Sequence, residues 1–206
     1  MVTRARRDEL NKPALRISHS VHGRRNEGQR VTYLVDPLGK GTEREIPERV
    51  VLARWRHRKL DKFTFSGSRL SPTLWRALPA FLGGNTEAWT RMTTDEIRTR
   101  QEARAAELKD LGLHPPAAEV VHALIEVCRA MTLAKLVERH VELGARKESG
   151  VPDLFLFARD RNGRARSPRF VEVKKPEEPM SAFQDDEIEF LRSLGLPARV
   201  LTLREK

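Results

Sequence analysis

Three charged residues in the last third of the chain have the types and the spacing to act together. Asp153 opens the apolar run Asp153–Phe157, and Glu172 and Lys174 stand two residues apart in a second apolar stretch. Side chains two residues apart on a β-strand point to the same face of the sheet. We therefore expect Glu172 and Lys174 to project together beside the segment that carries Asp153.

Two carboxylates and one ammonium group are costly to place near a core, because like charges repel and buried charges must be compensated. A divalent cation would compensate them, and hard oxygen ligands suit Mg²⁺ or Mn²⁺. Such a cation polarises a phosphoryl oxygen and lowers the pKa of a bound water. Lys174 could then stabilise developing negative charge or orient the attacking water. A Glu-x-Lys pair alone is more often an exposed charge pair, so both interpretations stay open at this point.

The elements around these residues are predicted from local signals. Residues 153–157 and 169–173 read as strands joined by a polar turn around Asn162-Gly163. Ser181 and Gln184 fit a capping box that begins a helix ending near Gly195. Residues 198–203 then supply a third strand. Two strands, a helix and a strand in this order indicate an α/β sheet with at least one crossover connection.

The upstream part is predicted to be largely helical. Residues 1–30 read as a basic N-terminal arm and residues 31–206 as a single domain. The predicted upstream elements are a strand at 31–35, a helix at 48–59, a short strand or loop at 63–66, a helix from Ser71, a helix at 93–111, and an apolar helical pattern running from Val120 to Gly144.

The charge balance favours a polyanionic partner. The chain has 39 Lys and Arg against 29 Asp and Glu, a formal net charge of +10, and contains no apolar run of membrane-spanning length. A basic cluster is predicted to contact the DNA phosphate backbone without reading sequence, with a solvated face as the alternative; it consists of Arg54, Arg56, Arg58, Lys59 and Lys62. The single cysteine, Cys128, lies on an apolar stripe, and the first residues are charged. Both observations favour a reducing, intracellular compartment such as cytoplasm or nucleoid.

The order of these motifs resembles that of the VRR-NUC branch of the PD-(D/E)XK nucleases. Gly150-Val-Pro-Asp153, then Glu172-Val-Lys174, then Gln184 follow one another as in that branch. The segments at 170–176 and 190–195 are similar, more narrowly, to the nuclease domain of the Fanconi-associated nucleases. This resemblance is strong over about residues 144–203 and weak over about residues 31–90.

The resemblance implies a fold, an activity and a set of residue roles. The fold would be a restriction-endonuclease-like core, a mixed central sheet flanked by helices with a helical upstream part. The activity would be Mg²⁺- or Mn²⁺-dependent hydrolysis of phosphodiester bonds in 5′ flaps and related branched DNA, with exonuclease activity from the 5′ end. Asp153, Glu172 and the main-chain carbonyl of Val173 would hold metal, Lys174 would be the catalytic lysine, and Gln184 would support the site.

The chain departs from the family pattern at one position. The family has a further glutamate in a Glu-Gly-Ser-like segment, where this chain has Ser66-Gly67-Ser68. Glu48 is the favoured replacement, and Glu119 and Glu126 are alternatives from a later helix. Two carboxylates could also suffice, or the chain could bind branched DNA without cutting it. A Holliday-junction resolvase of the VRR-NUC type is the alternative within enzymes.

Overall fold

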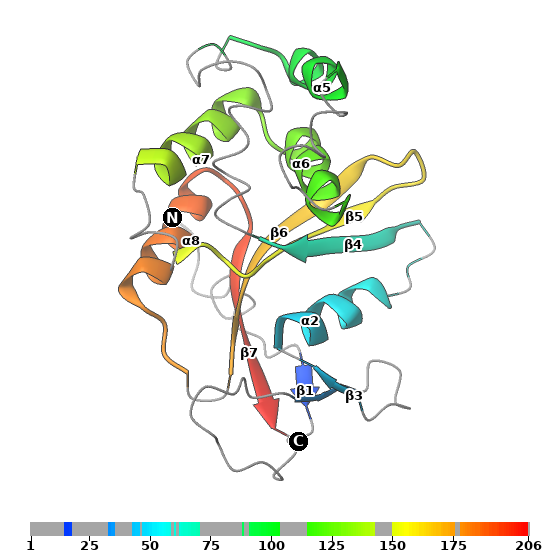
Figure 1. The fold of residues 1–206 in the computed structure, drawn as a ribbon, viewed down its shortest axis with the longest axis vertical. Helices are drawn as coiled ribbons and strands as arrows, with labels where there is room; N and C mark the ends of the chain where they lie inside the picture. The colour runs from blue at the N-terminus through cyan, green and yellow to red at the C-terminus, as the bar shows by residue number, and fades with distance from the viewer. Residues whose placement is uncertain are drawn as a thin grey trace.

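The computed structural model describes residues 15–17, 33–35, 43–45, 47–58, 60, 62–70, 88, 91–103, 115–142, 150–175 and 178–205 (Figure 1). The strands are β1 (Leu15–Ile17), β2 (Tyr33–Val35), β3 (Glu43–Glu45), β4 (Thr64–Arg69), β5 (Leu154–Arg159), β6 (Ala165–Lys174) and β7 (Ala198–Glu205). The helices are α2 (Pro47–Arg56), α5 (Thr94–Ala103), α6 (Pro115–Val127), α7 (Ala130–Glu142) and α8 (Ala182–Ser193).

The centre of the fold is a mixed five-stranded sheet in the order β1-β7-β6-β5-β4. The β4–β5 and β5–β6 pairs are antiparallel, whereas β7 pairs in parallel with both β6 and β1. Helix α8 is the crossover that makes the parallel β6–β7 pairing possible. Strands β2 and β3 form a separate antiparallel pair. The predicted mixed sheet flanked by helices is therefore confirmed.

Alternating side chains of the central strands feed two hydrophobic cores, one on each face of the sheet. On β5, Phe155 and Phe157 join the core formed with α6, α7 and α8, and Leu154 and Leu156 join the core formed with α2. The same alternation continues on β6, where Val171 and Val173 pack on the α2 face. Figure 1 shows α6 and α2 on opposite sides of the sheet. A residue's parity along β5, and along β6 from Arg169 to Lys174, thus decides which helices it meets. Earlier on β6 the register shifts, and Ala165 packs in the core on the α6 side.

Helix α8 is fixed at its start and in its middle. The predicted capping box at Ser181 and Gln184 is present in full. Farther along, the buried Glu187 accepts a 2.6 Å hydrogen bond from Arg139 Nε, and its other carboxylate oxygen lies 3.0 Å from His140 Nε2. Both partners belong to α7. The crossover helix is therefore anchored to its neighbour by an ion pair, and its first turn is held in place over β6.

Several sequence-based elements differ in extent from the observed ones. The apolar pattern from Val120 to Gly144 forms two helices, because the chain leaves helical geometry at Cys128 and Arg129 before α7 begins. Cys128 is buried, as predicted for a core thiol. Three residues of the predicted arm form β1, a strand too short to show a period of its own. The predicted helix from Ser71 lies outside the described residues, and no described helix is long and apolar enough to cross a membrane.

Gly67 on β4 is required by a close approach of two strands. A Cβ atom there would lie 2.7 Å from the main-chain oxygen of Phe155 and 2.8 Å from Leu156 Cδ2. Gly67→Ala should therefore destabilise the protein by about 1–3 kcal/mol through overpacking, although alanine is the better strand former. Urea unfolding of this variant against Ser68→Ala measures the effect. A Gly67→Ala protein as stable as wild type would show that β4 and β5 can separate freely.

Candidate active site

The first carboxylate of the site lies where β5 begins beside the end of β6. Asp153 immediately precedes β5, and its Oδ2 atom accepts a 2.8 Å hydrogen bond from the main-chain N–H of Val173. This bond ties the orientation of Asp153 to the strand that carries Glu172 and Lys174. The predicted proximity of these two segments is thus seen in a direct contact.

Glu172 and Lys174 are both buried, at 3% and 4% relative exposure. They alternate with Val171 and Val173, so they point away from α2 and toward α8. Lys174 Nζ lies 3.3 Å from Glu172 Oε1. Removing water from the Glu172 carboxylate and the Lys174 ammonium group costs free energy. Each group therefore needs hydrogen-bond partners in addition to the other.

Gln184 supplies those partners from the first turn of α8. Its Nε2 atom donates a 2.5 Å hydrogen bond to Glu172 Oε1, and its Oε1 atom accepts a 2.8 Å hydrogen bond from Lys174 Nζ. The same Oε1 atom accepts from the main-chain N–H of Ser181 at 2.9 Å, which completes the capping box. One amide side chain therefore caps the helix and bridges the acid and the lysine.

The two carboxylates are electrostatically coupled. Burial and the charge of Asp153 raise the pKa of Glu172 from its ordinary 4.5 to about 7, against the opposing effect of Lys174. Burial also raises the pKa of Asp153; the Val173 N–H lowers it in part, and the charge of Glu48 raises it further. The site thus holds more negative charge than Lys174 alone compensates.

These donors fit a hard divalent cation. Two coupled carboxylate groups, each partly deprived of water, gain most from a cation with oxygen preference such as Mg²⁺ or Mn²⁺. Within the described ranges, no three His, Cys, Asp or Glu residues gather closely enough to form a larger ligand set. A cation here would accordingly be held by Asp153 and Glu172, with water or main-chain oxygen completing its shell.

Glu48 lies on the Asp153 side of this site. It occupies the first turn of α2, its Oε1 atom lies 3.9 Å from Arg69 Nη2, and its charge acts on Asp153. Arg69 is a neighbour that sequence reasoning missed, because nothing in its local pattern distinguishes it from other basic residues. The α2 helix dipole also favours an acid at this position, so its location alone assigns Glu48 no role in metal binding.

The other two glutamates considered from sequence lie at a different place. Glu119 Oε1 accepts a 2.8 Å hydrogen bond from Ser66 Oγ, and Glu126 Oε2 accepts one from the Ala165 N–H. Both carboxylates also approach Arg159, at 3.5 and 3.4 Å. Ser66 stands opposite Phe157 in the sheet, several residues from Asp153. The structure therefore does not bring Glu119, Glu126 or Ser66 to the Asp153 site.

The basic cluster predicted to contact DNA is exposed where it is described. Arg54, Arg56, Arg58 and Lys62 are exposed, and Lys59 lies outside the described residues. Arg56 Nη2 donates a 2.6 Å hydrogen bond to the main-chain oxygen of Gly67, and the Arg58 guanidinium lies 5.0 Å from the centre of the Trp55 ring. Arg56 and Arg58 are thus partly fixed by local contacts.

Gly150, the first residue of the Gly-x-Pro-Asp motif, packs against the beginning of α8. A Cβ atom at this position would lie 2.6 Å from the main-chain oxygen of Phe183, the residue before Gln184. The motif therefore sets how closely the segment carrying Asp153 approaches the turn carrying Gln184. Sequence reasoning used this glycine as a family marker and did not see this contact.

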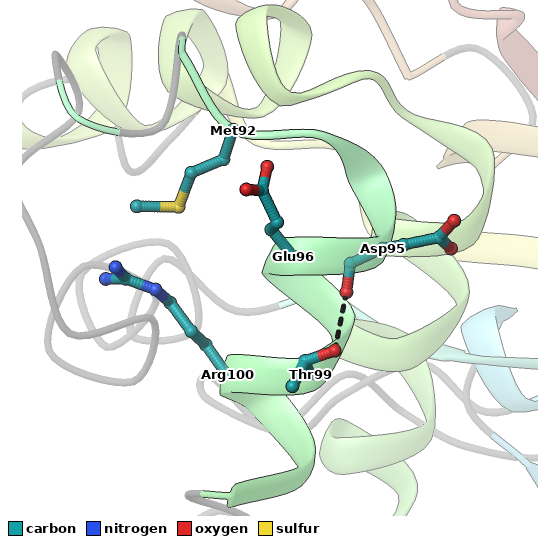
Figure 2. A pocket seen from close by; sticks show the side chains of 5 residues that line it. All are labelled: Met92, Asp95, Glu96, Thr99 and Arg100. Atoms are coloured by element: carbon teal, nitrogen blue, oxygen red, sulfur yellow. Dashed lines mark hydrogen bonds between the residues drawn. The ribbon is translucent and has the colours of Figure 1, made fainter.

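A surface hollow of about 380 Å³ lies beside α5 and contains none of these residues. It is lined by Met92, Asp95, Glu96, Thr99 and Arg100. Figure 2 shows the Asp95 carboxylate pointing away from Met92 and Arg100, and the Thr99 hydroxyl bonded to the Asp95 main-chain oxygen. Glu96 completes a local cap with Thr93. These contacts stabilise the first turns of α5.

Comparisons with known proteins match the motif order and the fold. The model of the VRR-NUC domain matches residues 85–205. A crystal structure of paFAN1 bound to 1nt 5′ flap DNA with gap superposes with a TM-score of 0.51 at 17% identity, covering 75% of this chain and 34% of that one. A second paFAN1 structure, bound to 2nt 5′ flap DNA with gap, gives a TM-score of 0.49 at 18% identity over 77% and 35%. This chain thus spans about a third of those structures, and no curated protein matches it.

The raised pKa of Glu172 predicts how stability changes with pH without metal. A group whose pKa is about 7 when folded and 4.5 when unfolded stabilises the fold fully below pH 4.5, and that contribution is lost as the pH rises toward 7. In EDTA, the melting temperature of wild type should therefore fall more between pH 5 and pH 8 than that of Glu172→Gln. Parallel changes in the two proteins would contradict the assignment.

Proposed function

This chain belongs to the VRR-NUC nuclease family, and on that premise we propose that it is a metal-dependent deoxyribonuclease that hydrolyses phosphodiester bonds in branched DNA such as 5′ flaps. The observation that carries the proposal is the buried Glu172–Gln184–Lys174 bridge beside Asp153. A sheet has no structural need for two coupled acids and a buried lysine at the ends of its strands.

Asp153, Glu172 and the main-chain carbonyl of Val173 would hold Mg²⁺ or Mn²⁺. Bound there, the cation would polarise a phosphoryl oxygen and lower the pKa of a coordinated water. Asp153 keeps one carboxylate oxygen on the Val173 N–H, which orients the group before any ligand arrives. Glu172 is oriented in the same way by the Gln184 amide.

Lys174 acts on the charge that develops on the phosphate. Its ammonium group remains close to Glu172 and Gln184 and can donate a further hydrogen bond toward a phosphate oxygen. Because the lysine is buried and already oriented, little reorganisation is needed when the phosphate becomes more negative. Gln184 is a positioning residue, since its contacts are to Lys174 and Glu172.

Branched DNA is the substrate class that best agrees with the comparisons. The paFAN1 structures are of complexes with 5′ flap DNA, and the present chain shares the nuclease fold with one of them at a TM-score of 0.51. The exposed arginines at the end of α2, with Lys59 and Lys62, would hold phosphates without reading bases. An exonuclease activity from the 5′ end belongs to the same proposal.

The proposal is tested with end-labelled 5′-flap, four-way-junction and linear duplex DNA in Mg²⁺ or Mn²⁺. Metal-dependent cleavage that is fastest on the flap, with shortening from the 5′ end, is the expected result. Cleavage confined to four-way junctions by a dimer would identify a resolvase instead. DNA binding without product at any protein concentration would identify a binder that does not cut.

Lys174→Ala should reduce cleavage by about a hundredfold to a thousandfold, the usual loss when one donor to a developing oxyanion is removed. Glu172→Ala should be at least as defective. The matched control is Lys175→Ala, which removes the neighbouring lysine, whose main-chain N–H bonds Glu178. If Lys174→Ala and Glu172→Ala both cut at the wild-type rate, the assignment of the site is wrong.

We also propose that Glu48, drawn toward Asp153 when a cation binds, supplies the third carboxylate, for which the family pattern has a glutamate where this chain has Ser66. Glu48→Gln should then raise the metal concentration needed for half-maximal cleavage about tenfold or more. Glu119→Gln, which removes a carboxylate held by Ser66 and Arg159, should leave that concentration unchanged. Equal behaviour of the two variants would leave Asp153 and Glu172 as the only carboxylate ligands.

A further inference from the structure

A second group of basic residues lies on the face of the sheet opposite the catalytic residues. It comprises Arg58 after α2, Arg169 on β6 and Arg199 on β7, and we call it the arginine cluster. We propose that the arginine cluster binds phosphodiester groups of DNA outside the cleavage site. The proposal rests on the proposed function for the identity of the ligand. It adds Arg169 and Arg199 to Arg58, which already belongs to the basic cluster predicted from sequence to contact DNA.

Trp55 positions two members of the arginine cluster, Arg58 and Arg169. The Arg58 and Arg169 guanidinium carbons each lie 5.0 Å from the centre of the Trp55 ring. The indole Nε1 atom donates to the main-chain oxygens of Ser66 at 2.9 Å and Phe157 at 3.1 Å. The ring is therefore fixed by two strands, and it holds both guanidinium groups beside it through cation–π contacts.

The cluster carries positive charge without an acid to balance it. Within the described part of the chain, no carboxylate forms an ion pair with any of its three members. Arg199 Nε is buried and has no hydrogen-bond partner there. Partial burial and the nearby charges of Arg199 and Arg58 lower the pKa of Arg169. An anion beside the cluster would relieve this repulsion through charge-assisted hydrogen bonds to the guanidinium groups.

The position of the cluster separates it from the reaction. Arg169 and Arg199 share the α2 face with Val171, which lies opposite Arg199 in the β6–β7 register. Glu172 and Lys174 point to the other face, and Arg169 precedes Glu172 by three residues, about 10 Å along the strand. A phosphate held by the cluster is therefore a different phosphate from the one cleaved, and it would orient the DNA on the domain.

Phosphodiester groups are favoured over other anions by the chemistry of the cluster. Guanidinium groups match phosphate oxygens with paired N–H donors, and several of them near one another suit a polyanion better than a single small ion. The net charge of +10 steers such a polyanion toward the chain. The cluster has no base-reading geometry of its own, so its contribution should be the same for every DNA sequence.

The test is DNA binding in EDTA, where cleavage cannot occur, measured over a range of salt concentrations with a labelled 5′ flap. The variants are Arg169→Gln/Arg199→Gln together and Arg169→Gln alone, because Arg58 also belongs to the basic cluster predicted from sequence. The matched control is Arg129→Gln, which removes one exposed positive charge between α6 and α7. Each lost phosphate contact should lower the slope of log affinity against log salt by about 0.9 and weaken binding severalfold.

Slopes and affinities equal to those of Arg129→Gln in both variants would overturn the proposal. If the double variant fails to fold, Arg169→Gln decides, because its side chain is partly exposed and is not part of the buried core. Melting in inorganic phosphate gives a second readout: wild type should be stabilised more than either cluster variant, and equal stabilisation would again count against the site.

The outcome is separable from that of the nuclease proposal. If wild type cuts DNA and the cluster variants bind like the control, the proposed role of the arginine cluster is wrong and the nuclease proposal stands. If wild type never cuts DNA but binds it through the arginine cluster, the nuclease proposal is wrong and the proposed second binding site stands. The first result and the second result cannot be confused, because binding is measured without metal and cleavage with it.

Discussion

The arrangement of the site depends on the cost of keeping Glu172 charged inside the sheet. Burial and the charge of Asp153 both oppose ionisation of Glu172. Lys174 and the Gln184 amide stabilise the Glu172 carboxylate, and the main-chain N–H of Val173 orients Asp153. The remaining negative charge is what a divalent cation would neutralise. The chemistry proposed for this VRR-NUC domain follows from an imbalance that the protein's own side chains do not remove.

The strand β6 divides two tasks between its two faces. Glu172 and Lys174 meet α8, whereas Arg169, Val171 and Val173 meet the α2 side. Since side chains alternate with period two, each face keeps its composition as long as the register holds. The Val173 N–H that donates to Asp153 belongs to the main chain of β6. A change in the register of β6 would therefore also displace the Asp153 carboxylate.

Local signals predicted the part of the structure that lies close together in sequence. The hairpin of β5 and β6, the capping box of α8 and the crossover to β7 follow from turn residues, spacing and apolar runs. The break between α6 and α7 carries no such signal, because the apolar stripe continues through Cys128. The arginine cluster could not be predicted either, since Arg58, Arg169 and Arg199 are brought together only by the sheet and by the Trp55 ring. The roles of Glu48 and Gln184 remain predictions that the geometry accommodates.

The capping box has a consequence for which substitutions this chain can tolerate. Glutamate serves at the third helical position as well as glutamine does in an isolated helix, and its carboxylate can accept the same bonds from Ser181 and Lys174. In this chain, however, the Nε2 amide group of Gln184 also donates a hydrogen bond to Glu172, and a glutamate would have no such donor. A residue that satisfies the helix alone would thus place a third acid against two that already repel. A substitution at Gln184 must therefore satisfy Glu172 as well as the start of the helix.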